Sequence, residues 1–148
     1  MVDCVSRVQD RAEINRAKLI KAGTVMFSER GSEGVSVRDL ENTAGVKRNL
    51  LAYHFDNKDS LWKRVTNDIY GLMKTEFDQR LLISQEMSGR ESLAFVVRFY
   101  VYFHARHPAL SRPVAQEATQ HSWRTQYMIA PPTRPGSPAM EQRQKHIQ

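Results

Sequence analysis

The sequence predicts an all-α fold, with a three-helix helix-turn-helix head followed by a partial helical domain. Apolar residues recur at helical spacing in several separate segments. Two of these segments begin with a serine followed by an acidic residue three positions later, which is the pattern of a capping box. Glycine or proline follows several of them, where a helix should end.

The first helix is expected over about residues 11–30. Its apolar residues lie at helical spacing, and Gly31 supplies the stop. The second helix is expected over residues 36–44, where Ser36 and Asp39 form a capping box. Its predicted buried stripe consists of Val37, Leu40 and Ala44. Its predicted solvent-facing residues are Arg38, Asp39, Glu41 and Asn42.

The third helix is expected over residues 47–55, after a tight turn at Gly45. Its front is basic, and its rear is mostly apolar and aromatic. A helix of about nine residues is roughly 13 Å long, close to the width of about 12 Å of the DNA major groove. From spacing and charge alone, the hairpin is either a DNA-reading unit or an ordinary helical pair with a solvated charged face.

Three further helices are predicted. The fourth should run from about Lys58 to about Leu82. The next should cover residues 90–106, with a capping box at Ser88 and Glu91. Its many β-branched and aromatic residues also suit a strand, but the length between the end signals favours a helix. Another helix is expected over residues 109–123. The proline-rich segment from Ile129 onward is expected to be disordered.

The composition is basic. The 148 residues carry 22 Lys and Arg against 16 Asp and Glu, a net charge of +6. This balance suits a polyanionic partner, either nucleic acid or an anionic membrane surface. Membrane is the weaker interpretation, because the apolar stretch of residues 93–103 is too short to span a bilayer. The N-terminus lacks a signal-peptide pattern and Cys4 is the only cysteine, so a cytoplasmic location is expected.

Residues 11–84 resemble the DNA-binding region of the tetracycline-repressor-like (TetR) family of bacterial transcription regulators. The resemblance rests on the ordered motifs F-x-E-x-G, S-V-R-D-L, A-G-V, Y-H-F and N-K-D-x-L. It is specific over roughly the first third of the chain and weak beyond it. It implies a DNA-binding head at residues 1–57, a helical regulatory region at 58–128 that is a partial effector and dimerisation domain, and a tail at 129–148.

The resemblance also implies which residues contact double-stranded DNA. Ser36 and Arg38 should reach the backbone or a groove edge. The positions that read bases are Lys47, Arg48, Asn49 and Leu50. The positions that contact phosphate are Tyr53, His54 and Lys58. Arg48 suits guanine, Asn49 adenine and Leu50 a thymine methyl. His54 is equally well interpreted as a packing residue. Lys47 and Ala52 stand where the family often has a serine and an aromatic residue, which leaves the target sequence open.

By the same resemblance, the chain is expected to be a ligand-responsive transcriptional repressor with a helical chamber for a small effector. Candidate lining residues are Met73, Phe77, Phe95, Phe99, Tyr102, Phe103 and Trp123. Aromatic residues at this spacing are more often plain core. His104, His107 and His121 lack the spacing of a metal site, and no catalytic constellation stands out. We therefore expect no metal, no cofactor and no enzyme.

Regulators of this family usually continue with two more long helices that form the dimer interface, so the chain resembles a member truncated at its C-terminus. A homodimer on a palindromic operator is expected from the family. Three alternatives stay open: dimerisation through the remaining helices, weak DNA binding, or a shortened gene product that regulates nothing. The rival function is a truncated helical effector-binding or interaction protein with weak or no DNA binding.

Overall fold

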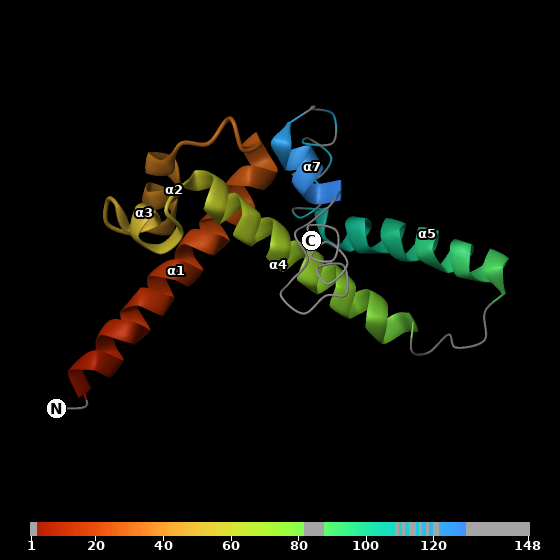
Figure 1. The fold of residues 1–148 in the computed structure, drawn as a ribbon, viewed down its shortest axis with the longest axis horizontal. Helices are drawn as coiled ribbons and strands as arrows, with labels where there is room; N and C mark the ends of the chain where they lie inside the picture. Colours follow the sequence, from red (N-terminus) through yellow and green to blue (C-terminus); the bar gives the residue numbers. More distant parts are fainter. Residues whose placement is uncertain are drawn as a thin grey trace, which may run out of the picture. The chain divides into compact units, whose positions relative to one another are not determined.

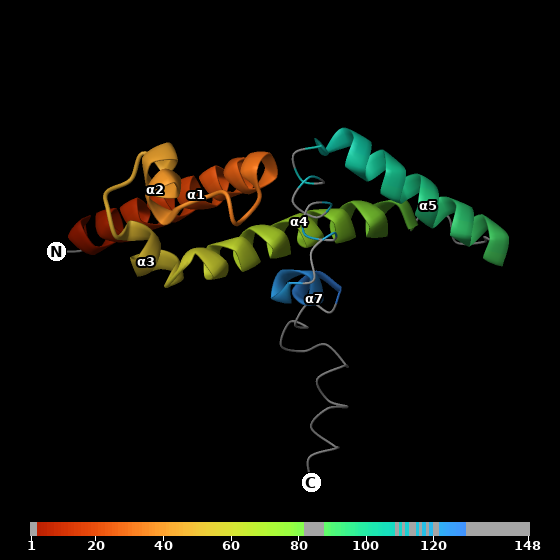
Figure 2. The same cartoon turned by 90° about the horizontal axis from the view of Figure 1, so that it is seen from above.

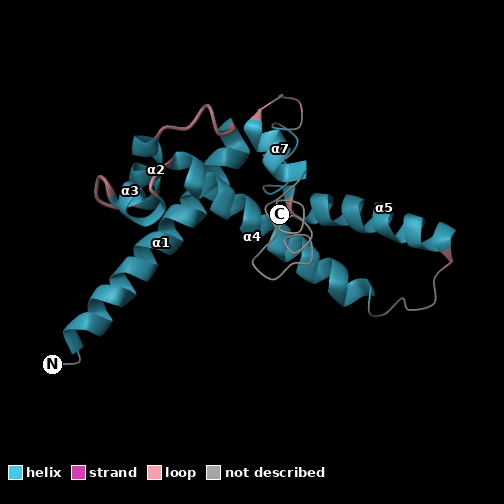
Figure 3. Cartoon of the chain, viewed as in Figure 1, coloured by secondary structure: helices cyan, strands magenta, loops and turns pink. Residues whose placement is uncertain are grey.

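The computed structural model describes residues 3–81, 88–108, 110, 112, 115, 117, 119 and 122–129. Among these residues the regular elements are all helices, as the sequence predicts (Figure 3). They are α1 (Asp3–Arg30), α2 (Val37–Ala44), α3 (Leu50–Phe55), α4 (Lys58–Leu81), α5 (Gly89–Arg106) and α7 (Trp123–Ile129). The chain divides into two compact units, Met1–Gln116 and Glu117–Gln148.

Some sequence predictions fall outside the described residues. They are the end of the fourth helix at Leu82, most of the helix over residues 109–123 including His121, and the tail beyond Ile129. Trp123, which we expected at the end of a helix, begins α7.

The first four helices pack together in the first unit (Figures 1 and 2), and their buried apolar side chains form one core. α1 packs against α2, α3 and α4, and α3 also packs against α4. The side chains at the centre are at most 2% exposed: Leu19, Phe27, Leu40, Leu51, Leu61 and Trp62. Burying a large apolar side chain contributes about 1.5–3 kcal/mol. This burial holds α2 and α3 in place, because helices of eight and six residues are unstable alone.

Both predicted capping boxes are present. The Asp39 backbone N–H donates to Ser36 Oγ over 3.1 Å, and the Ser36 N–H donates to Asp39 Oδ2 over 3.3 Å. The hydrogen bonds from Ser36 lower the pKa of Asp39. Ser88 and Glu91 form the same arrangement at the start of α5. The segment after this cap is a helix that runs to Arg106, so the strand interpretation of it is wrong.

The predicted faces of α2 are wrong at two positions. Val37 is 40% exposed, whereas Glu41 is only 5% exposed. Glu41 is buried because its carboxylate faces the start of α3 and accepts a hydrogen bond there. Leu40 is fully buried, as expected.

The third helix begins later than predicted, at Leu50 instead of residue 47. Asn49 has a φ of 66°, in the left-handed region, and an α-helix cannot continue through that conformation. The first helix begins earlier than predicted, at Asp3 instead of about residue 11.

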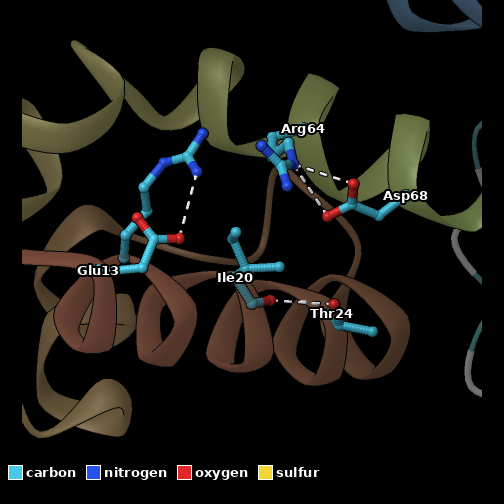
Figure 4. Close-up of polar contacts among 6 residues, drawn as sticks. Glu13, Ile20, Thr24, Arg64 and Asp68 are labelled. Atoms are coloured by element: carbon cyan, nitrogen blue, oxygen red, sulfur yellow. Dashed lines mark hydrogen bonds and ion pairs between the residues drawn. The ribbon is translucent and has the colours of Figure 1, made fainter. Parts of the chain in front are cut away.

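α1 and α4 approach closely at Gly23. A Cβ atom placed there would lie 3.2 Å from Val65 Cγ2 and 3.4 Å from Leu61 Cδ2. The polar contacts near this packing brace single helices: Arg64 Nε bonds Asp68 Oδ1 over 2.9 Å within α4, and the Thr24 hydroxyl donates to the Ile20 carbonyl within α1 (Figure 4). Apolar contacts at Gly23 thus join the two helices.

Lys58 ties the start of α4 to the segment between α1 and α2. Its ammonium donates to the Ser32 carbonyl over 2.8 Å and to the Val35 carbonyl over 3.1 Å. An ammonium has three N–H donors, so two of them are used here. Lys58 therefore helps to fix where α2 begins.

α5 returns along the second half of α4 (Figure 2). The Phe77 ring lies 5.6 Å from the Phe95 ring and 5.1 Å from the Phe99 ring, between centroids. His107 Nε2 lies 3.0 Å from Glu76 Oε1. Within the described ranges, none of the helices has the length and apolar content needed to cross a bilayer.

Gly23→Leu should lower the free energy of unfolding by about 1–3 kcal/mol, because the new side chain would force α1 and α4 apart. The matched control is Gly71→Leu in α4, where a Cβ meets nothing within 4 Å. That change should raise stability by up to about 1 kcal/mol through helix propensity. Urea denaturation measures both. Equal effects of the two substitutions would contradict the close approach.

Lys58→Met should destabilise the head by about 1–3 kcal/mol, because two half-buried carbonyls lose a charged donor. The control is Lys74→Met, which removes an exposed ion pair with Asp78 and should cost less than about 1 kcal/mol. Thermal unfolding followed by circular dichroism compares them. If the Lys58 variant were as stable as the Lys74 variant, the two hydrogen bonds from Lys58 to carbonyls would contribute nothing to the stability of the head.

Candidate DNA-binding surface

The segment from Ser36 to Phe55 folds as two short helices around a tight turn. Gly45, in the left-handed region with φ 64°, ends α2, and its N–H donates to the Asn42 carbonyl over 3.1 Å. Most of the residues predicted to contact DNA are exposed: Ser36, Arg38, Lys47, Arg48, Asn49 and Tyr53. Three are half-buried: Leu50, His54 and Lys58. Leu51 and Phe55 are buried and anchor α3.

The candidate base-reading side chains stand mainly on the turn before α3. Lys47 and Arg48 precede Asn49, whose φ of 66° and ψ of 5° place it in the left-handed region. Asparagine tolerates this conformation better than most residues. The Tyr53 N–H donates to the Asn49 carbonyl over 3.2 Å and starts the helix. Two cations and an amide thus lie at the front end of α3, where the helix dipole is positive.

Ser36 has a defined role within the protein. Its hydroxyl donates to Asp39 Oδ2 over 2.6 Å while accepting from the Asp39 N–H. A bond from this hydroxyl to a DNA phosphate would have to replace the bond to Asp39, since a hydroxyl has one donor. Arg38, which is exposed beside it, is the stronger candidate of the two for a phosphate contact.

Tyr53 and His54 differ in their access to a ligand. Tyr53 is 77% exposed, so its hydroxyl is accessible. The His54 ring lies edge-on to Tyr53, 5.0 Å between centroids, and its Nε2 is buried. Within the part of the chain that the structure describes, this nitrogen has no hydrogen-bond partner. These contacts support the packing interpretation of His54 more than a phosphate contact through Nε2.

Lys58 combines two possible roles. Its bonds to the Ser32 and Val35 carbonyls leave one N–H donor for a phosphate oxygen. Structural anchoring and phosphate contact are therefore compatible at this residue.

Sequence reasoning missed Glu41. Its carboxylate accepts a hydrogen bond from the N–H of Leu51, ten residues later. No local pattern signalled this bond, because Asn49, at the start of the third helix, is itself a residue whose side chain could cap that helix.

Two open apolar grooves lie on the α4 and α5 pair. The first, of about 380 Å³, is lined by Arg80, Phe95, Arg98, Phe99 and Tyr102. The second, of about 270 Å³, is lined by Met73, Lys74, Phe77, Val96, Phe99 and Tyr100. Five of the predicted effector residues therefore line grooves. Phe103 is instead fully buried, next to Phe99, and Trp123 belongs to the other unit.

The described histidines make aromatic and polar contacts. The His104 ring lies 4.2 Å from the Tyr100 ring, and burial lowers the pKa of His104. His107 lies against Glu76 and 4.8 Å from the Phe103 ring. Among the residues that the structure places, no three His, Cys, Asp or Glu side chains gather as a metal site would require.

Comparison with known proteins identifies the head. Residues 19–65 match the family described as bacterial regulatory proteins, tetR family. This match covers the second half of α1, the hairpin and the first part of α4, including all the residues predicted to contact DNA.

Curated relatives agree with that match. The chain is 29% identical over 108 residues to the HTH-type transcriptional repressor KstR2 of Rhodococcus jostii, covering 72% of this chain and 50% of the relative. It is 29% identical over 103 residues to the probable HTH-type transcriptional regulator YttP of Bacillus subtilis, covering 69% and 49%. It is 29% identical over 109 residues to the HTH-type transcriptional repressor NicS of Pseudomonas putida, covering 72% and 50%.

The chain thus spans about half the length of these curated relatives. Within that half, the motifs and the helical hairpin follow the family pattern together. Residues 19–65 of this chain thus carry the sequence pattern of the tetR family of bacterial regulatory proteins.

Proposed function

We propose that this protein is a sequence-specific DNA-binding transcriptional regulator that uses the α2–α3 hairpin to bind double-stranded DNA. One observation carries the proposal: the turn before α3 exposes Lys47, Arg48 and Asn49 together at the front of a helix in a tetR-type head. The net charge of +6 favours the same partner.

The proposed contacts divide into two kinds. Arg48 pairs with guanine and Asn49 with adenine in the major groove, where those side chains make bidentate bonds to base edges. Tyr53, Lys58 and Arg38 contact phosphates and so position the head without selecting a sequence. Lys47 adds a cation at the helix front, and Leu50 lies next to a base methyl group.

The proposed assembly is a homodimer on a palindromic operator. α3 has six residues and is about 9 Å long, so one copy reads one half-site. Two of the similar proteins, KstR2 and NicS, are named repressors, and we propose repression as the direction of control. The proposed location is the cytoplasm, where a bacterial transcription regulator meets its DNA.

The proposed effector is a small molecule that binds along α4 and α5. Both grooves are walled by aromatic and aliphatic side chains, and Arg80 and Arg98 line the first one. An apolar ligand with an acidic group matches this lining. α4 connects the groove to the head, since it begins at Lys58 beside the hairpin.

Arg48→Ala should reduce discrimination between the preferred duplex and a random duplex by about 1–3 kcal/mol, because a base-specific bidentate pair is lost. Tyr53→Phe should instead weaken both duplexes alike, by about 1 kcal/mol, because it removes one hydroxyl donor to phosphate. Fluorescence anisotropy at fixed salt measures both affinities. Equal proportional losses on both duplexes for the Arg48 variant would contradict the assigned roles.

Asn49→Gly tests base reading without disturbing the turn. Glycine adopts the left-handed conformation of residue 49 freely, so the fold should keep its stability while the preference for one adenine falls. Asn49→Ala should lose the same preference and also about 1 kcal/mol of stability from backbone strain. Competition binding with single-base variants of the preferred duplex, together with thermal unfolding, separates the two effects. An unchanged base preference in Asn49→Gly would remove Asn49 from the reading surface.

A further inference from the structure

α3 begins without a cap of its own. The first N–H groups of a helix have no partner within the helix, and an N-cap side chain usually accepts from one of them. Here the N-cap residue is Asn49, and its side chain makes no such bond. The N–H of Leu51, the second residue of α3, therefore requires an acceptor from elsewhere in the head.

That acceptor comes from α2. The Leu51 N–H donates to Glu41 Oε1 over 3.0 Å, in a buried position. The backbone carbonyl of Glu41 also accepts from the Val46 N–H over 3.1 Å. One residue thus holds the turn through its main chain and the next helix through its side chain.

A carboxylate is well suited to this position. A hydrogen bond to an ionised acceptor is stronger than one between neutral groups, and the positive end of a helix dipole stabilises a negative charge. α3 has only six residues, too few to keep its geometry by helix propensity. Leu51 and Phe55 anchor its rear face by burial, and Glu41 fixes its front.

The front of α3 carries the residues proposed to read DNA. Arg48 and Asn49 lie three and two positions before Leu51, whose N–H donates to Glu41. We infer that Glu41 is a positioning residue for DNA recognition: without touching DNA, its buried carboxylate holds the turn and the first residues of α3 at the angle that base reading requires. This inference rests on the proposed function.

The decisive comparison is between Glu41→Gln and Glu41→Leu. Both substitutions remove the negative charge, which affects binding to any duplex equally, and both nearly keep the side-chain volume. Only glutamine retains an oxygen that can accept from Leu51. The readout is the ratio of affinities for the duplex that the wild-type protein selects from a random pool and for a random duplex. Glu41→Gln should keep this ratio within about twofold, whereas Glu41→Leu should lower it at least about fivefold.

Amide hydrogen exchange in the free protein supplies a readout that does not depend on DNA. The Leu51 N–H should exchange faster in Glu41→Leu than in Glu41→Gln, because it loses its acceptor. Ile69→Ala is the stability control: Ile69 is buried on α4, further along the helix than the contacts of Leu61 and Val65 at Gly23 and outside the hairpin. It should lower the unfolding temperature while leaving the affinity ratio unchanged.

Two results would overturn the inference. In the first, Glu41→Leu has the same affinity ratio as Glu41→Gln although its Leu51 amide exchanges faster. Glu41 would then only stabilise the fold. In the second, the affinity ratio falls by the same factor in both variants. Recognition would then depend on the negative charge of Glu41 and not on its hydrogen bond with the Leu51 N–H. Failure of the proposed function itself gives a different result: the wild-type protein would select no duplex from the random pool. Glu41 could then have no role in recognition.

Discussion

The arrangement of the head depends on burial of one small apolar core. α2 and α3 have eight and six residues, lengths at which an isolated helix does not persist in water. They hold their form because Leu40, Leu51 and Phe55 are buried, where α2 packs against α1 and α3 packs against α1 and α4. α1 and α4 can serve as that support because Gly23 lets them approach closely. The position of the DNA-reading turn is thus a consequence of helix packing elsewhere.

Hydrogen bonds then fix the angles of α2 and α3, whose approximate positions are set by burial of the apolar core. Apolar contacts have little directional preference, whereas hydrogen bonds fix angles. Lys58 bonds to two carbonyls before α2, and Glu41 bonds to the start of α3, so the hairpin is held at its beginning and at the junction of its two helices. Both side chains are charged residues that a sequence pattern assigns to the solvent. Their partners lie 23 to 26 and ten residues away along the chain, and no local spacing rule finds such pairs.

The sequence predicted the helices and their caps well, because those depend on neighbouring residues. Ser36 with Asp39, Ser88 with Glu91 and Gly45 all act as their local patterns indicated. Prediction failed where tertiary contacts decide. Asn49 delays the start of α3, Glu41 turns inward, and Val37 stays exposed. Of the expected effector residues, five line grooves, because helical spacing places them on one side of α4 or α5, whereas the burial of Phe103 depends on packing between helices.

The exposed turn before α3 should let the hairpin recognise a defined DNA sequence. This recognition can be tested by a footprint of the purified protein on the DNA upstream of its own gene, at near-physiological salt and over a range of protein concentrations. We expect a bounded, two-fold symmetric protected site, since each recognition helix covers one half-site. Diffuse protection that disappears as salt is raised would show only non-specific attraction to phosphate, and the hairpin would then recognise no defined sequence.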